Sequence, residues 1–428
     1  MHKKRLVMKI IATGDWHIGN LFHGHDRLPE HKHFLGWLLS RIKEQRPDAL
    51  LVAGDVFDNG NPSPAAQSAY YAFLAEATDA CPGMQIVITA GNHDSASRLE
   101  APRALLTRHK VEIRGTVRRS WTQDDEGGRW EVDYDDLMIP VADEEGERVV
   151  VLAVPYLRSD VVQGASYSAG VNRFLRELTR RARVKYPDAR LFMMAHMYAK
   201  GADIAQKEAS EKIVIGGQEE VNMEGWSDHP DYLTCGHIHK RQHIWNTDWA
   251  RYTGSALPMS FSEIGYEHGV DVVTLSPGHK PKVEFLRYSP QHELRILPEN
   301  EEGLTKRKLQ ALIDKTLPDR GEDGRLKDDF VYLVIKVKLD KISNDEIKEL
   351  EAVVDRKNAV LCKIQKIVPA LDLSTISGDR ITSVEDILDR DPLDTLKEAF
   401  AIEHDKNMNE HQENMLKSLL ASINRENV

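Results

Sequence analysis

The sequence predicts an α/β protein in which two β-sheets pack face to face and helices cover their outer sides. Three observations support this fold class. Strands and helices alternate along residues 9–89, which implies right-handed crossovers and a parallel sheet. Short strands punctuated by glycine and proline fill much of residues 137–155 and 250–288, which indicates a second sheet packed on the first. Polar side chains directly follow five of the strands.

The first third of the chain carries the alternating pattern. Residues 9–13, 49–53 and 85–89 are apolar runs of strand length, and each is followed within two residues by a glycine. Residues 33–44 space their apolar side chains as one helix face does, and a second helix is expected over 65–80. In open α/β sheets, ligands bind beyond the carboxyl ends of the strands. The residues that follow these strands are therefore expected to share one edge.

The rest of the core and a smaller unit follow. A basic helix is expected over residues 172–185, and strands over 189–195 and 232–235. From about residue 290 the polar strand ends stop, and a small α/β unit is expected with strands at 292–297, 330–339 and 361–367 and helices at 304–317 and 344–355. Beyond residue 369 the chain is charged and helical, with apolar stripes. The predicted domains are residues 1–289, 290–370 and 371–428.

Composition narrows the class of protein. The 428 residues are 41% hydrophobic and 29% charged, which is typical of a soluble globular protein. No apolar run reaches the ~20 residues that span a bilayer, so no membrane partner is expected. Three cysteines without paired spacing and a basic start without a cleavage site predict free thiols in the cytoplasm. The net charge of −11 argues against tight unaided binding to nucleic acid.

The five strand ends carry side chains that bind metal ions in proteins. They are Asp15 with His17, Asp55, Asn92 with His93, His196, and His237 with His239. This mixture of carboxylate, amide and imidazole groups suits manganese, iron or zinc better than calcium, and no thiolate-rich set accompanies it. Each residue alone is an ordinary turn residue. Together, at successive strand ends, they predict a site for two divalent metal ions that share one anionic ligand.

The order of these motifs resembles that of the calcineurin-like metallophosphoesterases. The matching segments are residues 14–17, 54–58, 91–94, 195–196 and 236–239. Within that superfamily the chain is similar to the SbcD family of nuclease subunits. This closer similarity depends on the Asp-Trp-His-Ile-Gly form of the first motif and on residues 155–158, 252–255 and 257–263. The fold that the resemblance implies is a two-sheet metallophosphoesterase sandwich flanked by helices.

The resemblance also implies a role for each site residue. Asp15, His17 and His239 would hold the first metal ion, Asn92, His196 and His237 the second, and Asp55 would bridge both. His93 would not be a ligand but would contact the scissile phosphate and help to protonate the leaving oxygen. Asp94 would either orient His93 or serve only as a structural turn residue.

By the same resemblance, the chain would be a manganese-dependent DNA nuclease subunit in DNA repair and recombination. It would degrade double-stranded ends as an exonuclease and cut single strands as an endonuclease, with a hydroxide generated between two metal ions. It would act as a homodimer with an SbcC-type coiled-coil ATPase in a heterotetramer. Residues 290–370 would cap the site, and the helices of 371–428 would dock on the ATPase, which would supply the basic surface for DNA.

Two other functions remain open. A related phosphoesterase that acts on a small nucleotide or a phosphoprotein would carry the same metal site, although it would have less need of the extra unit and the helical tail. A scaffold that keeps the fold without the chemistry is expected to have lost ligands, and none is missing from this sequence.

Overall fold

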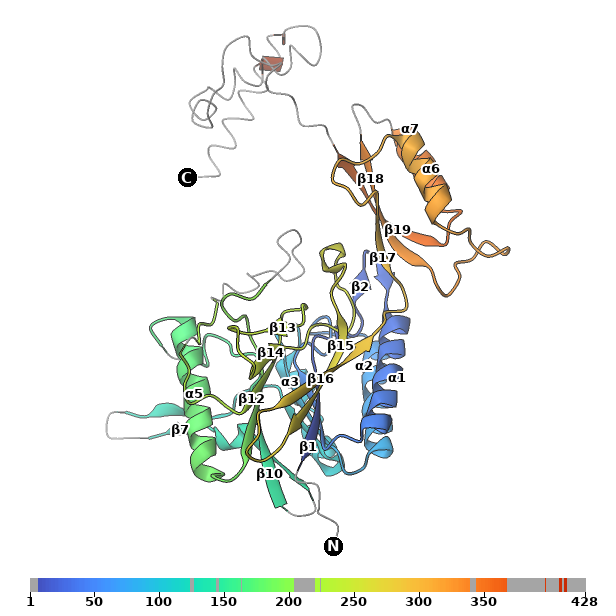
Figure 1. The fold of residues 1–428 in the computed structure, drawn as a ribbon. Helices are drawn as coiled ribbons and strands as arrows, with labels where there is room; N and C mark the ends of the chain where they lie inside the picture. Colours follow the sequence, from blue (N-terminus) through green and yellow to red (C-terminus); the bar gives the residue numbers. More distant parts are fainter. Residues whose placement is uncertain are drawn as a thin grey trace.

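The computed structural model describes residues 7–123, 127–143, 146–162, 164–203, 220–223, 225–338 and 344–367, together with 397, 408–409 and 412–413. Two six-stranded sheets form the main body, and a three-stranded sheet forms a smaller unit beside it (Figure 1). The predicted α/β fold with two packed sheets is confirmed. Apart from those last five residues, the helices expected over 371–428 lie outside the described residues.

The first sheet has the strand order β16-β15-β1-β4-β5-β6. Its parallel strands are β1 (Met8–Thr13), β4 (Ala49–Ala53), β5 (Gln85–Thr89) and β6 (Val111–Arg114). The antiparallel strands β15 (His268–Leu275) and β16 (Lys282–Tyr288) extend it beyond β1. The prediction that residues 250–288 belong to the second sheet is therefore wrong for these two strands. An apolar strand pattern reports that a strand is buried, as β15 is, but not which neighbour it pairs with.

Helices α1 (Leu28–Gln45) and α2 (Pro64–Ala80) pack their apolar faces on the first sheet. The Ser63 side chain accepts a hydrogen bond from the backbone N–H of Ala66 and caps α2. Helix α1 begins five residues before the predicted start at residue 33, with a proline in its first turn. The earlier start was missed because the first turn buries the polar residues Glu30 and His31, which mask the apolar periodicity.

The second sheet has the strand order β13-β14-β12-β11-β10-β9. Its strands are β9 (Met138–Asp143), β10 (Gly146–Ala153), β11 (Arg190–His196), β12 (Tyr232–Gly236), β13 (Gln242–His243) and β14 (Ala250–Tyr252). Helix α5 (Tyr167–Lys185) covers its outer side, opposite α1 and α2 across the two sheets (Figure 1). Between the sheets lies an apolar layer to which both contribute, including Leu51 and Val87 from the first and Val151 and Phe192 from the second.

Shorter elements connect these layers. They are the hairpin β2 (Leu21–Phe22) and β3 (His25–Asp26), helices α3 (Ala96–Glu100) and α4 (Arg103–Leu106), the hairpin β7 (Arg119–Thr122) and β8 (Arg129–Val132), and 3-10 turns at Thr107–His109, Asp135–Leu137 and Phe261–Glu263. The β7–β8 hairpin was not predicted, and it projects from the main body (Figure 1).

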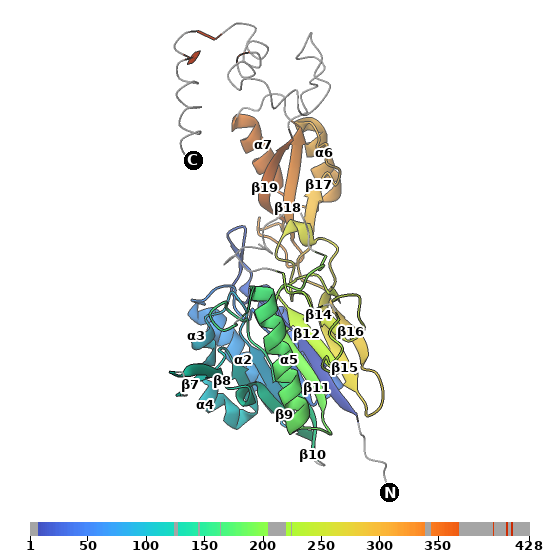
Figure 2. The same cartoon turned by 90° about the vertical axis from the view of Figure 1, so that its left-hand side faces the viewer.

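The smaller unit holds the parallel strands β17 (Leu294–Leu297), β18 (Val331–Lys338) and β19 (Ala359–Ile367), with α6 (Lys306–Thr316) and α7 (Asn344–Val354) on one face. It stands at one end of the two sheets (Figure 2). The other face of its sheet packs on the main body, where Tyr332, Val334 and Val360 meet Phe22 and Phe261. In the described parts of the chain, no helix is both long and apolar enough to cross a membrane.

Candidate metal centre

The side chains expected to bind metal ions lie at one edge of the main body, where parallel strands of both sheets end. From the first sheet, β1, β4 and β5 lead into Asp15, His17, Asp55 and Asn92; from the second, β11 and β12 supply His196, His237 and His239. Ligand atoms lie within 4.8 Å of one another in three sets, which are Asp15 with His17 and His239, His17 with Asp55 and His93, and Asp15 with Asp55 and His196. The two sheets therefore meet at this edge in one compact cluster.

The backbone is left-handed at four of these residues. The φ angle is 48° at Asp15, 48° at His17, 47° at Asp55 and 96° at His237. Residues other than glycine seldom adopt positive φ, and each such residue costs on the order of 1–3 kcal/mol that the surrounding structure must offset. Strain of this kind gathers at functional sites, so its concentration in the expected ligands supports a functional edge.

Two motif glycines allow the strand ends to approach one another closely. A Cβ atom on Gly91 would lie 2.1 Å from Oδ1 of Asp55. A Cβ atom on Gly236, in the second sheet, would lie 2.1 Å from the carbonyl oxygen of Ala53 in the first. Both distances are far inside contact range, so any larger residue would push the strand ends apart.

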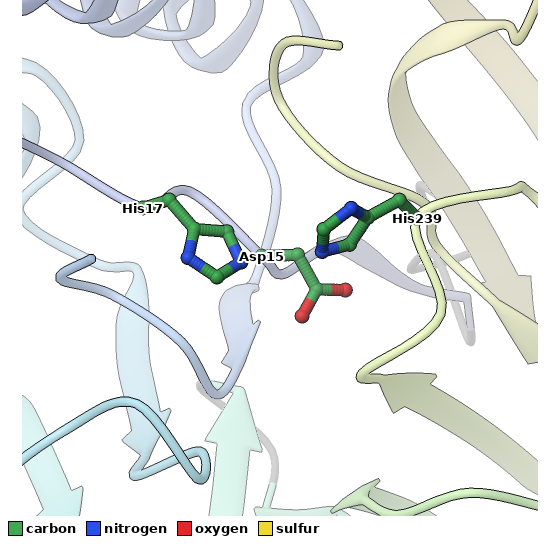
Figure 3. A group of neighbouring side chains, drawn as sticks. All are labelled: Asp15, His17 and His239. Carbon is green, nitrogen blue, oxygen red and sulfur yellow. The ribbon is translucent and has the colours of Figure 1, made fainter. Parts of the chain in front are cut away.

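Asp15, His17 and His239 form the first candidate metal position, and Figure 3 shows the two imidazoles on either side of the carboxylate. Both Asp15 oxygens accept a hydrogen bond from the backbone N–H of His237, at 2.9 and 3.1 Å. Nδ1 of His239 lies 3.0 Å from Oε1 of the buried Glu263. A carboxylate on Nδ1 leaves the Nε2 lone pair for a metal ion and fixes the ring.

Asn92, His196 and His237 form the second candidate position. Oδ1 of Asn92 lies 2.9 Å from Nε2 of His196 and 2.9 Å from Nδ1 of His237. Nδ1 of His196 donates to the carbonyl oxygen of Ala53 at 2.9 Å, which joins the two sheets. Oδ2 of Asp55 lies 3.3 Å from Nε2 of His196 and 3.8 Å from Nε2 of His17. Asp55 therefore lies between the two positions.

Burial and mutual attraction set the protonation of this cluster. Burial lowers the pKa of His17 well below its ordinary value and that of His237 to about 3, so both imidazoles are neutral. Burial raises the pKa of Asp15 to about 7. Burial alone would lower the pKa of His196, but the facing Asp55 carboxylate raises it to about 9. Burial would likewise raise the pKa of Asp55, but attraction to His196 holds it below its usual range.

These residues fit divalent metal ions. The donors are imidazoles, carboxylates and one amide oxygen. Neutral imidazole is the form that binds a metal, and His17 and His237 are neutral already, whereas an ion at the second position would have to displace the proton that Asp55 stabilises on His196. Nε2 of His17 is buried and has no hydrogen-bond partner among the described residues. Burying a polar atom in this way costs free energy unless a bound ion takes the place of the missing partner. The raised pKa of Asp15 marks a buried carboxylate whose charge a cation would compensate.

His93 lies beside the cluster and is held through its backbone and its ring. Its N–H donates to Oδ1 of Asp55 at 2.9 Å, and its Nδ1 lies 2.9 Å from the carbonyl oxygen of Asp58. Because a carbonyl only accepts, Nδ1 donates, and Nε2 is the nitrogen left to exchange a proton. The His93 ring lies 4.9 Å from the ring of His17, at the edge of the first position.

Asp94 makes the contacts of a structural turn residue, which is one of the two roles that the sequence left open. Its Oδ2 accepts hydrogen bonds from the backbone N–H groups of Gly91 and Val56, at 2.9 and 3.1 Å, and its Oδ1 accepts one from Phe57 at 2.9 Å. Asp94 therefore ties the loop after β5 to the loop after β4. The contact that orients the His93 ring comes from Asp58 instead, so a direct orienting role for Asp94 is not what the contacts favour.

Glu263 was not predicted as a site residue. Residues 257–263 contributed to the family resemblance, but no role was assigned to the glutamate. It lies 24 positions after His239 in the chain, a separation that carries no metal-binding spacing signal. Only the fold, which places the loop after β14 beside the loop after β12, brings the carboxylate to the imidazole.

Comparison with known proteins identifies the class of this protein. The family model of calcineurin-like phosphoesterases matches residues 8–241, a span that contains every expected metal ligand. The chain belongs to the calcineurin-like phosphoesterases, and the metallophosphoesterase fold expected from the sequence is confirmed.

Similar sequences narrow the class further. The SbcD subunit of nuclease SbcCD from Rhodobacter capsulatus is 37% identical over 347 residues, which cover 77% of this chain and 80% of the relative. The SbcD proteins of Escherichia coli K12 and Bacillus subtilis 168 are 29% identical over 303 residues and 30% identical over 287 residues. These matches cover 68% and 64% of this chain and 70% and 68% of the relatives. Within the phosphoesterases, the chain is a member of the SbcD family of nuclease subunits.

Proposed function

We propose that this chain is the manganese-dependent nuclease subunit of an SbcCD-type complex and hydrolyses phosphodiester bonds at DNA ends. It acts as an exonuclease on double-stranded ends and as an endonuclease on single strands. The observation that carries the proposal is the convergence of oxygen and imidazole donors from two sheets on two adjacent positions, with Asp55 between them. Mixed donors of this kind without thiolates suit manganese, iron or zinc better than calcium, and manganese is the ion that the SbcD resemblance implies.

The proposed ligand sets follow the two positions. Asp15, His17 and His239 hold one ion, Asn92, His196 and His237 hold the other, and Asp55 is shared. When bound, the two ions neutralise phosphate charge and lower the pKa of the attacking water. The protein's own contribution is rigidity. Glu263 fixes the His239 ring, and the strained strand ends hold the donors in place before the substrate arrives.

His93 serves as the proton donor in this proposal. Its Nδ1 is committed to the Asp58 carbonyl, so Nε2 is the nitrogen that gives a proton to the leaving oxygen. An imidazole suits this task because it gains and loses a proton near neutral pH. The hydrogen bond from the His93 backbone to Asp55 keeps the donor next to the shared ligand.

The proposed partners are DNA and an SbcC-type coiled-coil ATPase, with a homodimer of this chain inside a heterotetramer in the cytoplasm. The relatives are named as one component of the SbcCD nuclease, and this supports such a complex. A net charge of −11 makes a basic surface on the ATPase useful for DNA binding. Residues 290–370 would cap the metal site, and residues 371–428 would dock on the ATPase.

The test is degradation of an end-labelled linear DNA duplex with manganese, magnesium or a chelator, with and without the ATPase. The chain is compared with His93→Ala and with His279→Ala, which removes an exposed histidine in the turn between β15 and β16. We expect cutting that requires manganese. His93→Ala should lower the rate by about 10²-fold or more while manganese content stays normal, and His279→Ala should behave as the unmodified chain.

The same assay distinguishes a DNA nuclease from a phosphoesterase that acts on a small nucleotide. Rapid hydrolysis of a small nucleotide diester, with no cutting of DNA under any condition, would overturn the nuclease proposal and leave the metal site intact. Normal cutting by His93→Ala would remove His93 from the chemistry.

A further inference from the structure

A buried ion pair stands at the junction of the main body and the smaller unit. Arg27 is 0% exposed and Glu30 is 2% exposed. Nε and Nη2 of Arg27 donate to the two carboxylate oxygens of Glu30 at 2.9 and 2.8 Å. Burying two charges costs about as much as their attraction returns, so a buried pair is weak evidence of stabilisation and prompts a search for another role.

One end of the pair is held by the smaller unit. Tyr332 on β18 donates its hydroxyl hydrogen to Oε1 of Glu30 at 2.9 Å. Its ring centre lies 5.1 Å from that of Phe22, and the Arg27 guanidinium lies 5.6 Å from the Tyr332 ring and 5.0 Å from the Phe22 ring. Glu30 and Arg27 are therefore in direct contact with β18, and their positions depend on where β18 lies.

The other end reaches the candidate metal centre. Nη1 of Arg27 donates to the carbonyl oxygen of Pro258 at 2.5 Å. One residue on, the Met259 N–H donates to Oε2 of Glu263 at 2.7 Å. Oε1 of the same glutamate lies 3.0 Å from Nδ1 of His239. Hydrogen bonds thus run from Tyr332 to the imidazole, with only the Pro258–Met259 peptide link between them.

An aromatic contact reinforces this route. Phe261 belongs to the same segment, residues 258–263, and its ring centre lies 5.5 Å from that of Phe22. Phe22 and Phe261 join Tyr332, Val334 and Val360 in the cluster between the smaller unit and the main body. Segment 258–263 is therefore held at Pro258 by Arg27 and at Phe261 by the interface, and it presents Glu263 to His239.

We propose that Tyr332, Glu30 and Arg27 are positioning residues that make the seating of the smaller unit a determinant of how His239 binds the first metal ion. The inference rests on the proposed assignment of His239 as a ligand. Displacement of β18 removes the hydrogen bond from Tyr332 to Glu30 and weakens the one from Arg27 to the Pro258 carbonyl. Segment 258–263 then relaxes, and the imidazole loses the carboxylate that orients it. A partner that shifts the smaller unit would in this way change the metal centre.

The test measures Mn²⁺ binding rather than DNA cutting. Calorimetric titration gives the affinity, and the electron paramagnetic resonance spectrum distinguishes coupled from isolated Mn²⁺. Tyr332→Phe, which removes only a hydroxyl, should weaken the first position by roughly threefold to tenfold. Glu263→Gln should weaken it by roughly tenfold or more. If both act through one route, the double variant should bind no more weakly than Glu263→Gln alone.

Val353→Ala is the matched control, because it loosens the packing of α7 on the opposite face of the same sheet and touches neither the interface with the main body nor the polar route. It should lower thermal stability and leave Mn²⁺ affinity unchanged. Wild-type affinity in Tyr332→Phe, or effects of the two substitutions that add, would overturn the coupling. His239→Ala tests the ligand assignment separately from the coupling. If it retains both ions, the ligand assignment itself fails and the coupling with it. If it loses one ion while Tyr332→Phe binds as wild type, only the coupling fails.

Discussion

The two six-stranded sheets share a strand plan but supply different chemistry to their common edge. Each contains four neighbouring parallel strands, β1-β4-β5-β6 in the first and β14-β12-β11-β10 in the second. The first sheet supplies both carboxylates, Asp15 and Asp55, the amide of Asn92 and one imidazole, that of His17. The second supplies imidazoles alone. All the oxygen donors therefore come from one sheet and three of the four expected imidazole ligands from the other, so the full set exists only where the sheets meet in the correct register.

The contacts between the sheets differ from their middle to their edge. The middle is a layer of apolar side chains, whose attraction is strong but has no preferred direction. At the edge, the His237 N–H donates to the Asp15 carboxylate, and His196 donates to the Ala53 carbonyl. Directional bonds of this kind fix the register that the apolar layer leaves loose. The edge thus carries the candidate metal centre and also aligns the two sheets.

The largest effect is expected from removing the shared oxygen donor of the first sheet. Asp55→Ala takes a ligand from both positions, so manganese content should fall to none and DNA cutting by at least about 10³-fold, since several kcal/mol of transition-state stabilisation depend on the ions. His237→Ala takes an imidazole from one position and should leave one ion. Metal analysis after gel filtration measures both. Two ions retained by Asp55→Ala would show that the sheets do not share a ligand.

A smaller but sharper effect is expected from a single methyl group placed between the sheets. Gly236→Ala puts a Cβ 2.1 Å from the carbonyl oxygen of Ala53, so the ends of β12 and β4 must separate. A displacement of about 1 Å in a catalytic array lowers the rate by about 10²-fold. Gly83→Ala is the control, because a Cβ there has no neighbour within 4 Å. Equal rates for both variants would show that the edge tolerates an altered register.

Metal removal should weaken the edge selectively. At a free concentration 100 times the dissociation constant, an ion that binds only the folded state adds about 2.7 kcal/mol to the free energy of unfolding. Chelation should lower the melting temperature accordingly. Hydrogen exchange should rise at the ends of β4 and β12 more than in α5 on the outer side. An unchanged melting temperature after chelation would argue against metal ions as the link between the sheets.

The sequence predicted that these side chains meet at one edge, because its signal is local. An apolar run, a glycine and a metal-type side chain adjoin one another at Asp15 and Asp55, and the parallel-sheet rule then brings separate strand ends together. The strands of the smaller unit were found for the same reason, since their apolar runs are continuous. Strand partners were harder to predict. Nothing within β15 states that it lies beside β1 rather than in the second sheet.

Side chains that act across long separations were missed altogether. Glu263 reaches His239 across 24 residues, and Tyr332 reaches Glu30 across 302. In the sequence, His31 belongs to a histidine-rich stretch that is typical of a polar loop and the start of a helix, and nothing there marks the neighbouring Arg27 and Glu30 for burial. The structure buries all three, because Arg27 and Glu30 neutralise each other and the smaller unit covers them. Burial of this pair depends on the smaller unit that covers it, and Tyr332 of that unit lies 302 residues after Glu30 in the chain.

The smallest of the predicted effects is that of acid pH. It should act on α1, the helix that covers the first sheet, and not on α5, the helix that covers the second. In α1, on the first sheet, burial and the neighbouring charge of Arg27 lower the pKa of His31 to about 4, whereas the one buried polar side chain of α5, Thr179, does not titrate. The unfolded chain, with a histidine pKa of about 6.5, therefore binds the proton more readily, so stability falls as pH falls from 6.5 towards 4. Between pH 7 and pH 5 this histidine should lower the free energy of unfolding by about 2 kcal/mol.

His31→Asn keeps a donor for the Arg27 carbonyl and cannot titrate. Its stability, measured by urea unfolding, should therefore be less sensitive to pH by that amount, while His279→Asn should follow the unmodified chain. Parallel curves for His31→Asn and the unmodified chain would show that acid sensitivity resides at the metal edge instead.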